Sequence, residues 1–298
     1  MSLLKRFGRR LAAISAVAAT ACGAAPAAEP VAAKPALWKI ADKDTTIYLF
    51  GTVHLLPKGT AWRSPAFDKA VAASDTLVVE TIVDEKNPEP VRDALRTLAV
   101  TPNLPPITDR VSPEKRAALM DVIRISGIPI EIYNSMETWA DGYLLLLTQL
   151  GRLGLDPGVE STIKTQFTDA GKPIGQLETV TEQLGFFDSL PEEAQRKFVE
   201  EALEDPVEMK KELDGMVSAW SSGDVKAISR TFNDELKGSQ DFKNALLVRR
   251  NANWAKWVKG RLDQPGTILV AVGAGHLAGD QSVQTMLKRQ GVKVTRVQ

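Results

Sequence analysis

The chain has 298 residues, of which 44% are hydrophobic and 25% charged, with 37 basic residues against 37 acidic ones. This is the composition of a globular protein that can bury a sizeable core. The balanced charge gives no electrostatic reason to expect binding to nucleic acid or to an anionic membrane surface.

The first 28 residues have the layout of a secretory signal peptide. Four basic residues, the last of them Arg10, precede an apolar run from Leu11 to Ala21, and a stretch of small residues follows. The apolar run has about eleven residues, whereas about twenty are needed to span a bilayer. Removal of this leader leaves 33 basic against 37 acidic residues, so we expect a mildly acidic mature protein.

The only cysteine, Cys22, directly follows Ala19-Thr20-Ala21, a loose version of the lipobox of bacterial lipoproteins. Two hypotheses stay open: a lipoprotein leader that ends before Cys22, or ordinary cleavage before Cys22 or after Ala27. In both cases the mature domain has no cysteine for a disulfide or a cysteine-based zinc site. We expect an exported protein of a Gram-negative bacterium, either periplasmic or an outer-membrane lipoprotein whose only membrane contact is the lipid on Cys22.

A linker over residues 29–36 leads into a β-α-β segment. ALWKIA and TTIYLFG are predicted to be the strands of a hairpin, with Asp42-Lys43-Asp44 as its turn. RSPAFDKAVAASD is predicted to be a helix, and TLVVETIV a second buried strand.

The middle of the chain is predicted to be mostly helical. The predicted helices are SPEKRAALMDVIRIS, NSMETWADGYLLLLTQLGRLG, GVESTIKTQFTDAGK, VTEQLGFF, LPEEAQRKFVEEALE, DPVEMKKELDGMVSAWSSG, DVKAISRTFNDEL and DFKNALLVRRNANWAKWVKGRL, with PIGQLE as a short strand among them. The end returns to a β-α-β pattern: TILVAVGAG, a helix over DQSVQTMLKRQG, and KVTRV. These patterns predict an α/β fold over residues 37–298, a single domain whose mixed central sheet comes from both terminal segments, with a large helical insertion.

The two histidines of the chain occur in one repeated context. His54 in IYLFGTVHLLP and His276 in VAVGAGHLAGD both follow an apolar strand, a glycine and two small residues. In α/β sheets, ligands bind just beyond the carboxyl ends of the strands, and glycine there allows a sharp turn. Imidazole in that place can serve as a metal ligand or a general base.

A metal held by two histidines requires further ligands, and a carboxylate is the usual third one in hydrolytic sites. The first candidate is Glu80, because it closes the apolar strand after the first histidine motif. Glu160 in DPGVEST and Glu178 in GQLETV are further candidates. Arg250 and Asn251 in VRRNANW could orient a substrate or its developing charge; the alternative is a surface arginine and a capping asparagine.

Several short motifs, in their order and spacing, resemble the TraB/PrgY/GumN family over roughly residues 36 to 298. They are GTVHLLP, Glu80 on the next strand, LET after a GKP turn, RN-x-x-W in a late helix and GAGH before the last helix. That family is similar to the Tiki metalloproteases and to erythromycin esterase-like and ChaN-like proteins. The resemblance implies an α/β fold and a manganese or cobalt ion. By position it implicates His54, His276 and Glu80, with Arg250 and Asn251 as contacts of the ligands or the substrate.

We therefore expect an exported metal-dependent hydrolase, a peptidase that acts on a peptide or protein. His54, His276 and Glu80 are expected to hold Mn²⁺ or Co²⁺, with Zn²⁺ as the alternative, and the metal to activate a water molecule. Glu160 or Glu178 is expected to handle protons, and Arg250 or Asn251 to stabilise the oxyanion. Two other hypotheses stay open: a non-catalytic protein that sequesters a peptide in the same cleft, and a metal-independent esterase with a histidine as base.

Overall fold

The structure is a computed structural model that describes residues 33–84, 86–235 and 240–298, without the side chains of 232–235. The predicted signal peptide, Cys22 and the first half of the predicted linker, 29–32, lie outside the described residues. Within the described ranges, no helix combines the length and the apolar character needed to cross a membrane.

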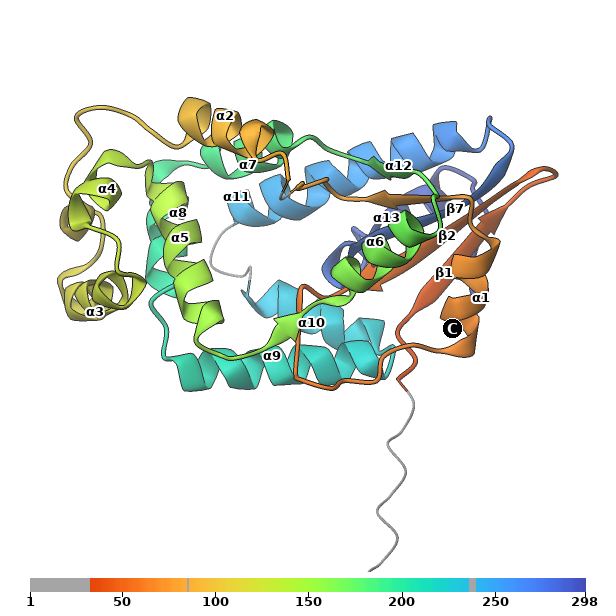
Figure 1. The fold of residues 1–298 in the computed structure, drawn as a ribbon, viewed down its shortest axis with the longest axis horizontal. Helices are drawn as coiled ribbons and strands as arrows, with labels where there is room; N and C mark the ends of the chain where they lie inside the picture. The colour runs from red at the N-terminus through yellow and green to blue at the C-terminus, as the bar shows by residue number, and fades with distance from the viewer. Residues whose placement is uncertain (1–32, 85, 236–239) are drawn as a thin grey trace, which may run out of the picture. The chain divides into compact units, whose positions relative to one another are not determined.

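Six strands form one mixed sheet in the order β6-β4-β7-β2-β1-β8 (Figure 1). The strands are β1 Leu37–Ala41, β2 Thr45–Thr52, β4 Thr76–Val79, β6 Ile174–Gln176, β7 Gly266–Gly273 and β8 Val294–Arg296. Strands β2, β7, β4 and β6 are parallel, whereas β1 is antiparallel to both of its neighbours. The predicted α/β class is confirmed. The C-terminal strand β7 lies between the N-terminal strands β2 and β4, so both ends of the chain build one sheet.

Helices cover both faces of the sheet, as the apolar strands require. In β7, Leu269 and Ala271 point to one face, whereas Ile268 and Val270 point to the other, and all four are buried. The first face packs against α1 Pro65–Ala73, α6 Val159–Asp169, α9 Pro206–Ser221 and α10 Val225–Glu235. The second face packs against α12 Arg249–Arg261 and α13 Val283–Arg289.

The chain between β4 and β7 is largely helical, as predicted. Besides α6, α9, α10 and α12, it contains α2 Glu89–Leu98, α3 Arg116–Ser126, α4 Ile130–Ser135, α5 Thr138–Gly151, α7 Val180–Asp188, α8 Glu192–Glu201 and α11 Gln240–Lys243. Part of this insertion has a core of its own, in which Leu119, Tyr133, Leu145 and Val199 pack together. Helix α7 begins with a capping box: Thr179 accepts from the N–H of Glu182, whose carboxylate accepts from the N–H of Thr179.

Several local elements differ from the sequence prediction. The helix predicted from Ser112 begins as a 3₁₀ turn, Pro113–Lys115, before α3. The N–H of Ser112 donates to the carboxylate of Glu200, and its hydroxyl caps no helix. Helix α2 and a two-stranded ribbon of β3 Leu55–Leu56 and β5 Asp156–Pro157 were not predicted. Strands of two residues are too short to show a period of two.

The long helix predicted before β7 is interrupted. A π-helical segment, η4 Asn244–Val248, separates α11 from α12. π-Helical turns inside α-helices are frequent at functional sites, because the extra residue shifts the register of the side chains that follow. Here the first residues after η4 are Arg249 and Arg250, so the π segment lies directly before a predicted site residue.

Candidate functional site

Both histidine motifs and Glu80 lie at the same edge of the sheet. Strands β2 and β7 are parallel neighbours with Thr52 opposite Gly273, so His54 and His276 follow adjacent strand ends. On the other side of β7 lies β4, and Glu80 is the first residue after that strand. The three residues therefore follow the carboxyl ends of three adjacent parallel strands, the edge at which α/β sheets bind ligands.

His276 lies on a short 3₁₀ turn, η5 Ala274–Leu277, and only 8% of it is exposed. Its ring packs against Trp254, with the centroids 4.3 Å apart. Its Nδ1 lies 2.6 Å from Oδ1 of Asn251. The amide nitrogen of Asn251 donates to the carbonyl of Gln281 at 2.7 Å, so Oδ1 must be the atom that faces His276. The proton of the neutral imidazole is thus assigned to Nδ1, and Nε2 keeps its lone pair.

Arg250 joins the other charged groups of the site. Its Nη2 donates to Oε2 of Glu80 at 2.6 Å, and its Nε donates to both carboxylate oxygens of Glu178 at 3.1 and 3.0 Å. Its Nη1 lies 3.2 Å from Nε2 of His276 and donates to the carbonyl of Leu246 at 3.3 Å. The guanidinium therefore fills the space between two carboxylates and the lone pair of an imidazole.

Glu80 accepts two further hydrogen bonds. Its Oε1 accepts from the backbone N–H of Gly273 at 2.7 Å, and its Oε2 from the side-chain amide of Gln183 at 3.3 Å. Burial acts to raise the pKa of Glu80, but the charges of His276 and Arg250 and the N–H of Gly273 outweigh it and bring the pKa to about 2. Glu80 is therefore ionised at neutral pH, because hydrogen bonds to the charged form favour it.

Glu178 shares Arg250 with Glu80 but lies in a different environment. It follows β6, is 6% exposed, and accepts from Nε1 of Trp254 at 2.9 Å. Burial raises its pKa, although Arg250 acts against this rise. The site thus contains two carboxylates whose pKa values are shifted in opposite directions, an arrangement typical of proton-transfer sites.

Burial also controls the charge of His276. Loss of solvent lowers the pKa of His276 to about 3, and the positive charge of Arg250 acts in the same direction, while Glu80 opposes both. At neutral pH the imidazole is uncharged. Its lone pair on Nε2 is available to Arg250 in the structure.

His54 lies at the rim of this cluster, and 75% of its side chain is exposed. Its Nδ1 forms an ion pair with Oε1 of Glu160 at 2.9 Å. This contact raises the pKa of His54 to about 9, and the charge of Glu80 adds to the rise. With Nδ1 held by Glu160, Nε2 is the ring nitrogen left for a substrate or a water molecule.

The pairing of His54 with Glu160 depends on a close backbone contact. The N–H groups of Gly158 and Val159 donate to the carbonyls of His54 and Val53 at 2.7 and 3.2 Å. A Cβ on Gly158 would lie 1.9 Å from the carbonyl oxygen of Val53, which no structure tolerates. Glycine at this position lets α6 begin against the loop after β2, and Glu160 is then the second residue of that helix.

The seven residues singled out in the sequence fall into two groups. Glu80, Glu178, Arg250, Asn251 and His276 form the buried cluster, and His54 with Glu160 forms the pair at its rim. Both amide atoms of Asn251 are engaged by His276 and Gln281, so its place in the cluster is to orient the imidazole.

Two further side chains take part in the site. Trp254, the tryptophan of the RN-x-x-W motif, was given no role from the sequence; it packs on His276 and donates to Glu178 from one helical turn after Arg250. Gln183 donates to Glu80 from α7, and no motif marks it.

A divalent metal requires at least three protein ligands around one point. Nε2 of His276 and Oε1 of Glu80 converge at 3.9 Å, but Nη1 of Arg250 approaches the same nitrogen. Among the described residues, no three His, Cys, Asp or Glu side chains lie close enough to hold one ion. As arranged, these residues do not fit a metal. No third ligand among the described residues is close to His276 and Glu80, and Nη1 of Arg250 lies where an ion bound to Nε2 of His276 would have to be. Metal ligation by His54, His276 and Glu80 stays a prediction.

Comparison with known proteins agrees with the motifs at these strand ends. The sequence profile of the TraB/PrgY/gumN family matches residues 36–296. The chain belongs to the TraB/PrgY/gumN family. All seven residues of the site lie inside the matched region of this family.

Two relatives of the same name are similar to this chain over most of its length. The chain is 24% identical over 243 residues to "Uncharacterized protein YbaP" of Escherichia coli (strain K12), an alignment that covers 81% of this chain and 87% of that protein. The protein of the same description from Shigella flexneri matches equally, with 24% identity over 243 residues. No solved structure matches the chain.

Proposed function

We propose that this TraB/PrgY/gumN protein is a hydrolase that cleaves the amide bond of a peptide or the acyl–oxygen bond of an ester. The single observation that carries the proposal is an exposed histidine, His54, whose Nδ1 is held by Glu160 beside a buried cluster of perturbed acids and bases. Clusters of ionisable groups with shifted pKa values at a strand edge are typical of catalytic sites.

In this proposal His54 transfers the proton. The contact with Glu160 fixes the orientation of the ring and stabilises the imidazolium, as a carboxylate does for a catalytic histidine in other hydrolases. Nε2 then takes a proton from a water molecule that attacks the carbonyl carbon, and returns it to the leaving group. Because the pKa of His54 is raised to about 9, the rate should increase with pH up to about 9.

The buried cluster holds the site in place. Arg250 is held between Glu80 and Glu178, and their carboxylates fix the position of the guanidinium at the strand edge. Asn251 and Trp254 fix the ring of His276, so its Nε2 lone pair stays directed at Nη1 of Arg250. Rigid support of this kind is what a hydrolytic site requires.

A metal-dependent form of the same hydrolase is the second candidate, and one observation favours it. Nε2 of His276 and Oε1 of Glu80 already converge at 3.9 Å, and the tautomer of His276 leaves the correct nitrogen for a metal. This form requires Nη1 of Arg250 to move away and His54 to supply the third ligand. The ions to be considered are Mn²⁺, Co²⁺ and Zn²⁺.

Export is part of the proposal and is supported by the leader of 28 residues alone. We propose a periplasmic protein or an outer-membrane lipoprotein, with peptides or proteins as substrates. Mass spectrometry of the protein recovered from cells separates the two forms, because a diacylglyceryl group on Cys22 adds a defined mass. An intact leader on the recovered protein would contradict export.

The decisive experiment is a hydrolysis assay on purified protein with quenched fluorescent peptides and nitrophenyl esters, with and without EDTA. The variants are His54→Ala, His276→Ala and Glu80→Gln, and Glu193→Gln on the exposed surface of α8 is the matched control. We expect activity in the wild type and the control, and about a hundredfold loss or more in His54→Ala.

The same assay separates the candidates. Activity that survives EDTA supports the metal-independent form, whereas activity lost with EDTA and restored by Mn²⁺, Co²⁺ or Zn²⁺ supports the metal-dependent form. Peptide binding without turnover, unchanged by EDTA and by His54→Ala, supports a sequestering protein. Hydrolysis that is equal in wild type and His54→Ala overturns the proposal.

A further inference from the structure

Arg250 has a polar partner for every nitrogen of its guanidinium. Its Nε donates to both oxygens of Glu178 at 3.1 and 3.0 Å, and its Nη2 contacts Oε2 of Glu80 at 2.6 Å and Oε2 of Glu178 at 2.9 Å. Its Nη1 donates to the carbonyl of Leu246 at 3.3 Å and lies 3.2 Å from Nε2 of His276. A guanidinium has five N–H donors and no acceptor, so it suits a space that is surrounded by lone pairs.

Two aromatic rings add to these contacts. The central carbon of the guanidinium lies 4.7 Å from the ring centroid of Trp254 and 5.7 Å from that of Phe186. Aromatic faces attract a cation, most strongly where solvent is excluded, and only 8% of the Arg250 side chain is exposed. Trp254 also donates its indole N–H to Glu178 at 2.9 Å, so the ring and the carboxylate support each other around the same guanidinium. Movement of Arg250 out of this position would break all of these contacts together.

The side chains around Arg250 are of the kinds that a divalent ion prefers. Carboxylate oxygens and a neutral imidazole nitrogen are typical ligands of Mn²⁺, Co²⁺ and Zn²⁺. Oε1 of Glu80 lies 3.9 Å from Nε2 of His276, and Glu80 and Glu178 both contact Nη2 of the guanidinium. Their present separation fits the guanidinium and not an ion, since no three such side chains of the described chain are close enough to hold a metal.

A divalent ion and the guanidinium exclude each other at this place. An ion bound to Nε2 of His276 requires the lone pair that now faces Nη1 of Arg250. Both groups are cations, and like charges a few ångströms apart in a buried site repel strongly, because little solvent screens them. A guanidinium has no lone pair to offer, so Arg250 cannot become a ligand itself.

We propose that the guanidinium of Arg250 is the permanent cation of this cluster and takes the place of a divalent metal ion between Glu80, Glu178 and His276. A metal ion then binds these three side chains only after Arg250 has been removed. The inference goes beyond the proposed function, because it concerns what the cluster binds and not what the protein cleaves. It disagrees with the metal site that the family resemblance implies, and within the proposed hydrolase it favours the metal-independent form.

The test is a binding measurement on the full-length protein that does not depend on turnover. Isothermal titration calorimetry with MnCl₂ and CoCl₂ gives the affinity and the number of ions bound, and the visible absorption of Co²⁺ reports its nitrogen and oxygen ligands. We expect the wild type to bind neither ion at the cluster. Arg250→Ala should bind one ion at least about a hundredfold more tightly than any site of the wild type, since two carboxylates and an imidazole then surround a vacated space.

Three further variants assign this ion to the cluster. Arg250→Ala/His276→Ala should lose it, because the imidazole ligand is gone. Arg250→Lys keeps a cation between the carboxylates and should exclude the ion as the wild type does. Arg250→Gln repeats the test with a larger neutral side chain if Arg250→Ala does not fold.

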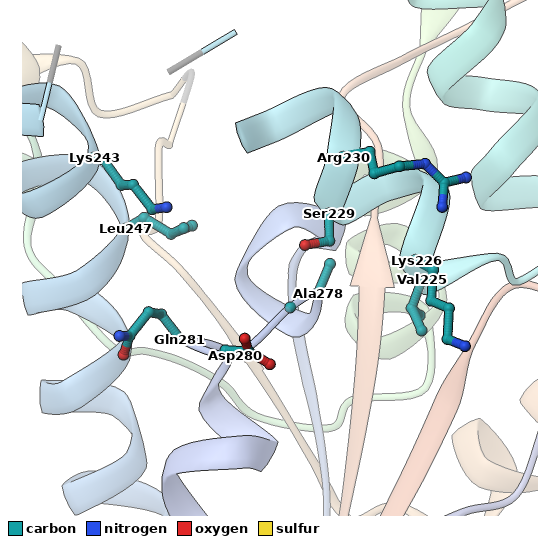
Figure 2. A pocket seen from close by; sticks show the side chains of 10 residues that line it. Val225, Lys226, Ser229, Arg230, Lys243, Leu247, Ala278, Asp280 and Gln281 are labelled. Carbon is teal, nitrogen blue, oxygen red and sulfur yellow. The ribbon is translucent and has the colours of Figure 1, made fainter. Parts of the chain in front are cut away.

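A neighbouring groove supplies the control for ions bound elsewhere. The groove has a volume of about 460 Å³ and is lined in part by the loop after His276, and Figure 2 shows Asp280 and Gln281 of this loop. The carbonyl of Gln281 accepts from the amide of Asn251, so the groove lies next to the cluster without sharing its side chains. Asp280 is an exposed acid of the lining, and Arg250→Ala/Asp280→Asn should bind the ion as tightly as Arg250→Ala does.

One ion bound by the wild type and lost in His276→Ala overturns the proposal, and this measurement needs no variant of Arg250. So does a folded Arg250→Ala or Arg250→Gln that binds no more metal than the wild type. An ion whose affinity falls with Asp280→Asn belongs to the groove, and this result also overturns the assignment to the cluster. Failure of the hydrolase proposal looks different: no peptide or ester is cleaved, whichever of these proteins binds metal.

Discussion

Nη1 of Arg250 lies 3.2 Å from Nε2 of His276, a contact in which only one of the two can donate. A guanidinium has no acceptor, so Nε2 must carry the lone pair. On the other side of the ring, Asn251 presents its oxygen to Nδ1 at 2.6 Å, and this requires a proton on Nδ1. Two independent neighbours therefore select the same neutral tautomer of His276.

This relationship predicts the NMR spectrum of the two histidines. In protein labelled with ¹⁵N-histidine, His276 should show an unprotonated Nε2 and a protonated Nδ1 between pH 5 and 8, because its pKa is lowered to about 3. His54 should titrate at a pKa above the ordinary value, because Glu160 stabilises its charged form. A protonated Nε2 on His276 in this range would contradict the assignment.

Asn251→Ala should allow His276 to adopt either neutral tautomer, because the acceptor that faces Nδ1 is removed. The variant leaves Nδ1 of His276 and the carbonyl of Gln281 without their buried partner, at a cost of about 1–3 kcal/mol in the free energy of unfolding. Denaturant unfolding measures the loss, and the ¹⁵N spectrum should show a mixture of tautomers. Asn253→Ala, on the exposed side of the same helix, is the matched control and should change neither readout.

The pKa of His276 also predicts how stability depends on pH. Its folded-state pKa of about 3 lies below the ordinary 6.5, so the unfolded chain binds more protons between these values. Its contribution to the free energy of unfolding is therefore fully present above pH 6.5 and is lost as the pH falls toward 3. Glu80, with a pKa lowered from 4.5 to about 2, adds a loss of the same sign below pH 4.5.

The measurement is the difference in unfolding free energy between wild type and His276→Asn from pH 8 to pH 5. Asparagine keeps a donor toward Asn251 but does not titrate. Other shifted groups, such as Asp141 and His54, contribute to both proteins and cancel in the difference. We expect the advantage of the wild type to shrink below pH 6.5, and a difference independent of pH would contradict the neutral buried imidazole.

Glu80→Gln should destabilise the protein strongly. The substitution removes one of two carboxylates that hold Arg250 and leaves a largely buried guanidinium with less compensation, at a cost of about 3 kcal/mol. Chemical denaturation measures the change. Glu193→Gln, whose ion pair with Lys197 is exposed, should cost less than about 1 kcal/mol. Equal effects of the two variants would show that Arg250 does not depend on Glu80.

Gly158→Ala should disrupt the pairing of His54 with Glu160. Its Cβ would lie 1.9 Å from the backbone oxygen of Val53, so the start of α6 must move. We expect loss of more than about 3 kcal/mol of stability or failure to fold, the result of a backbone clash. Gly151→Ala has nothing within 4 Å of its Cβ and should be neutral or slightly stabilising. Thermal unfolding compares the two, and an unchanged melting temperature for Gly158→Ala would contradict the contact.

Much of the fold could be predicted from local patterns. The hairpin of β1 and β2, the helix α1 and the strand β7 each show a clear apolar period, and all of them are present in the structure. The elements that were missed, such as the β3–β5 ribbon and the π segment before Arg250, depend on contacts between distant parts of the chain. A ribbon of two residues per strand has no period of its own.

The sequence by itself determined which residues reach the site. Glycines after apolar runs placed His54 and His276 at strand ends, and the apolar runs indicated that those strands are buried. The parallel pairing of β2 with β7 is a result of the tertiary structure. Only the tertiary structure decided how the polar groups pair: Arg250 stands between Glu80, Glu178 and His276, and Glu160 turns to His54. The physical reason is the distance along the chain over which each property is encoded. A period of two or 3.6 residues is visible within one segment, whereas the partner of a charge depends on a few ångströms between residues such as Glu80 and Arg250, which are 170 positions apart.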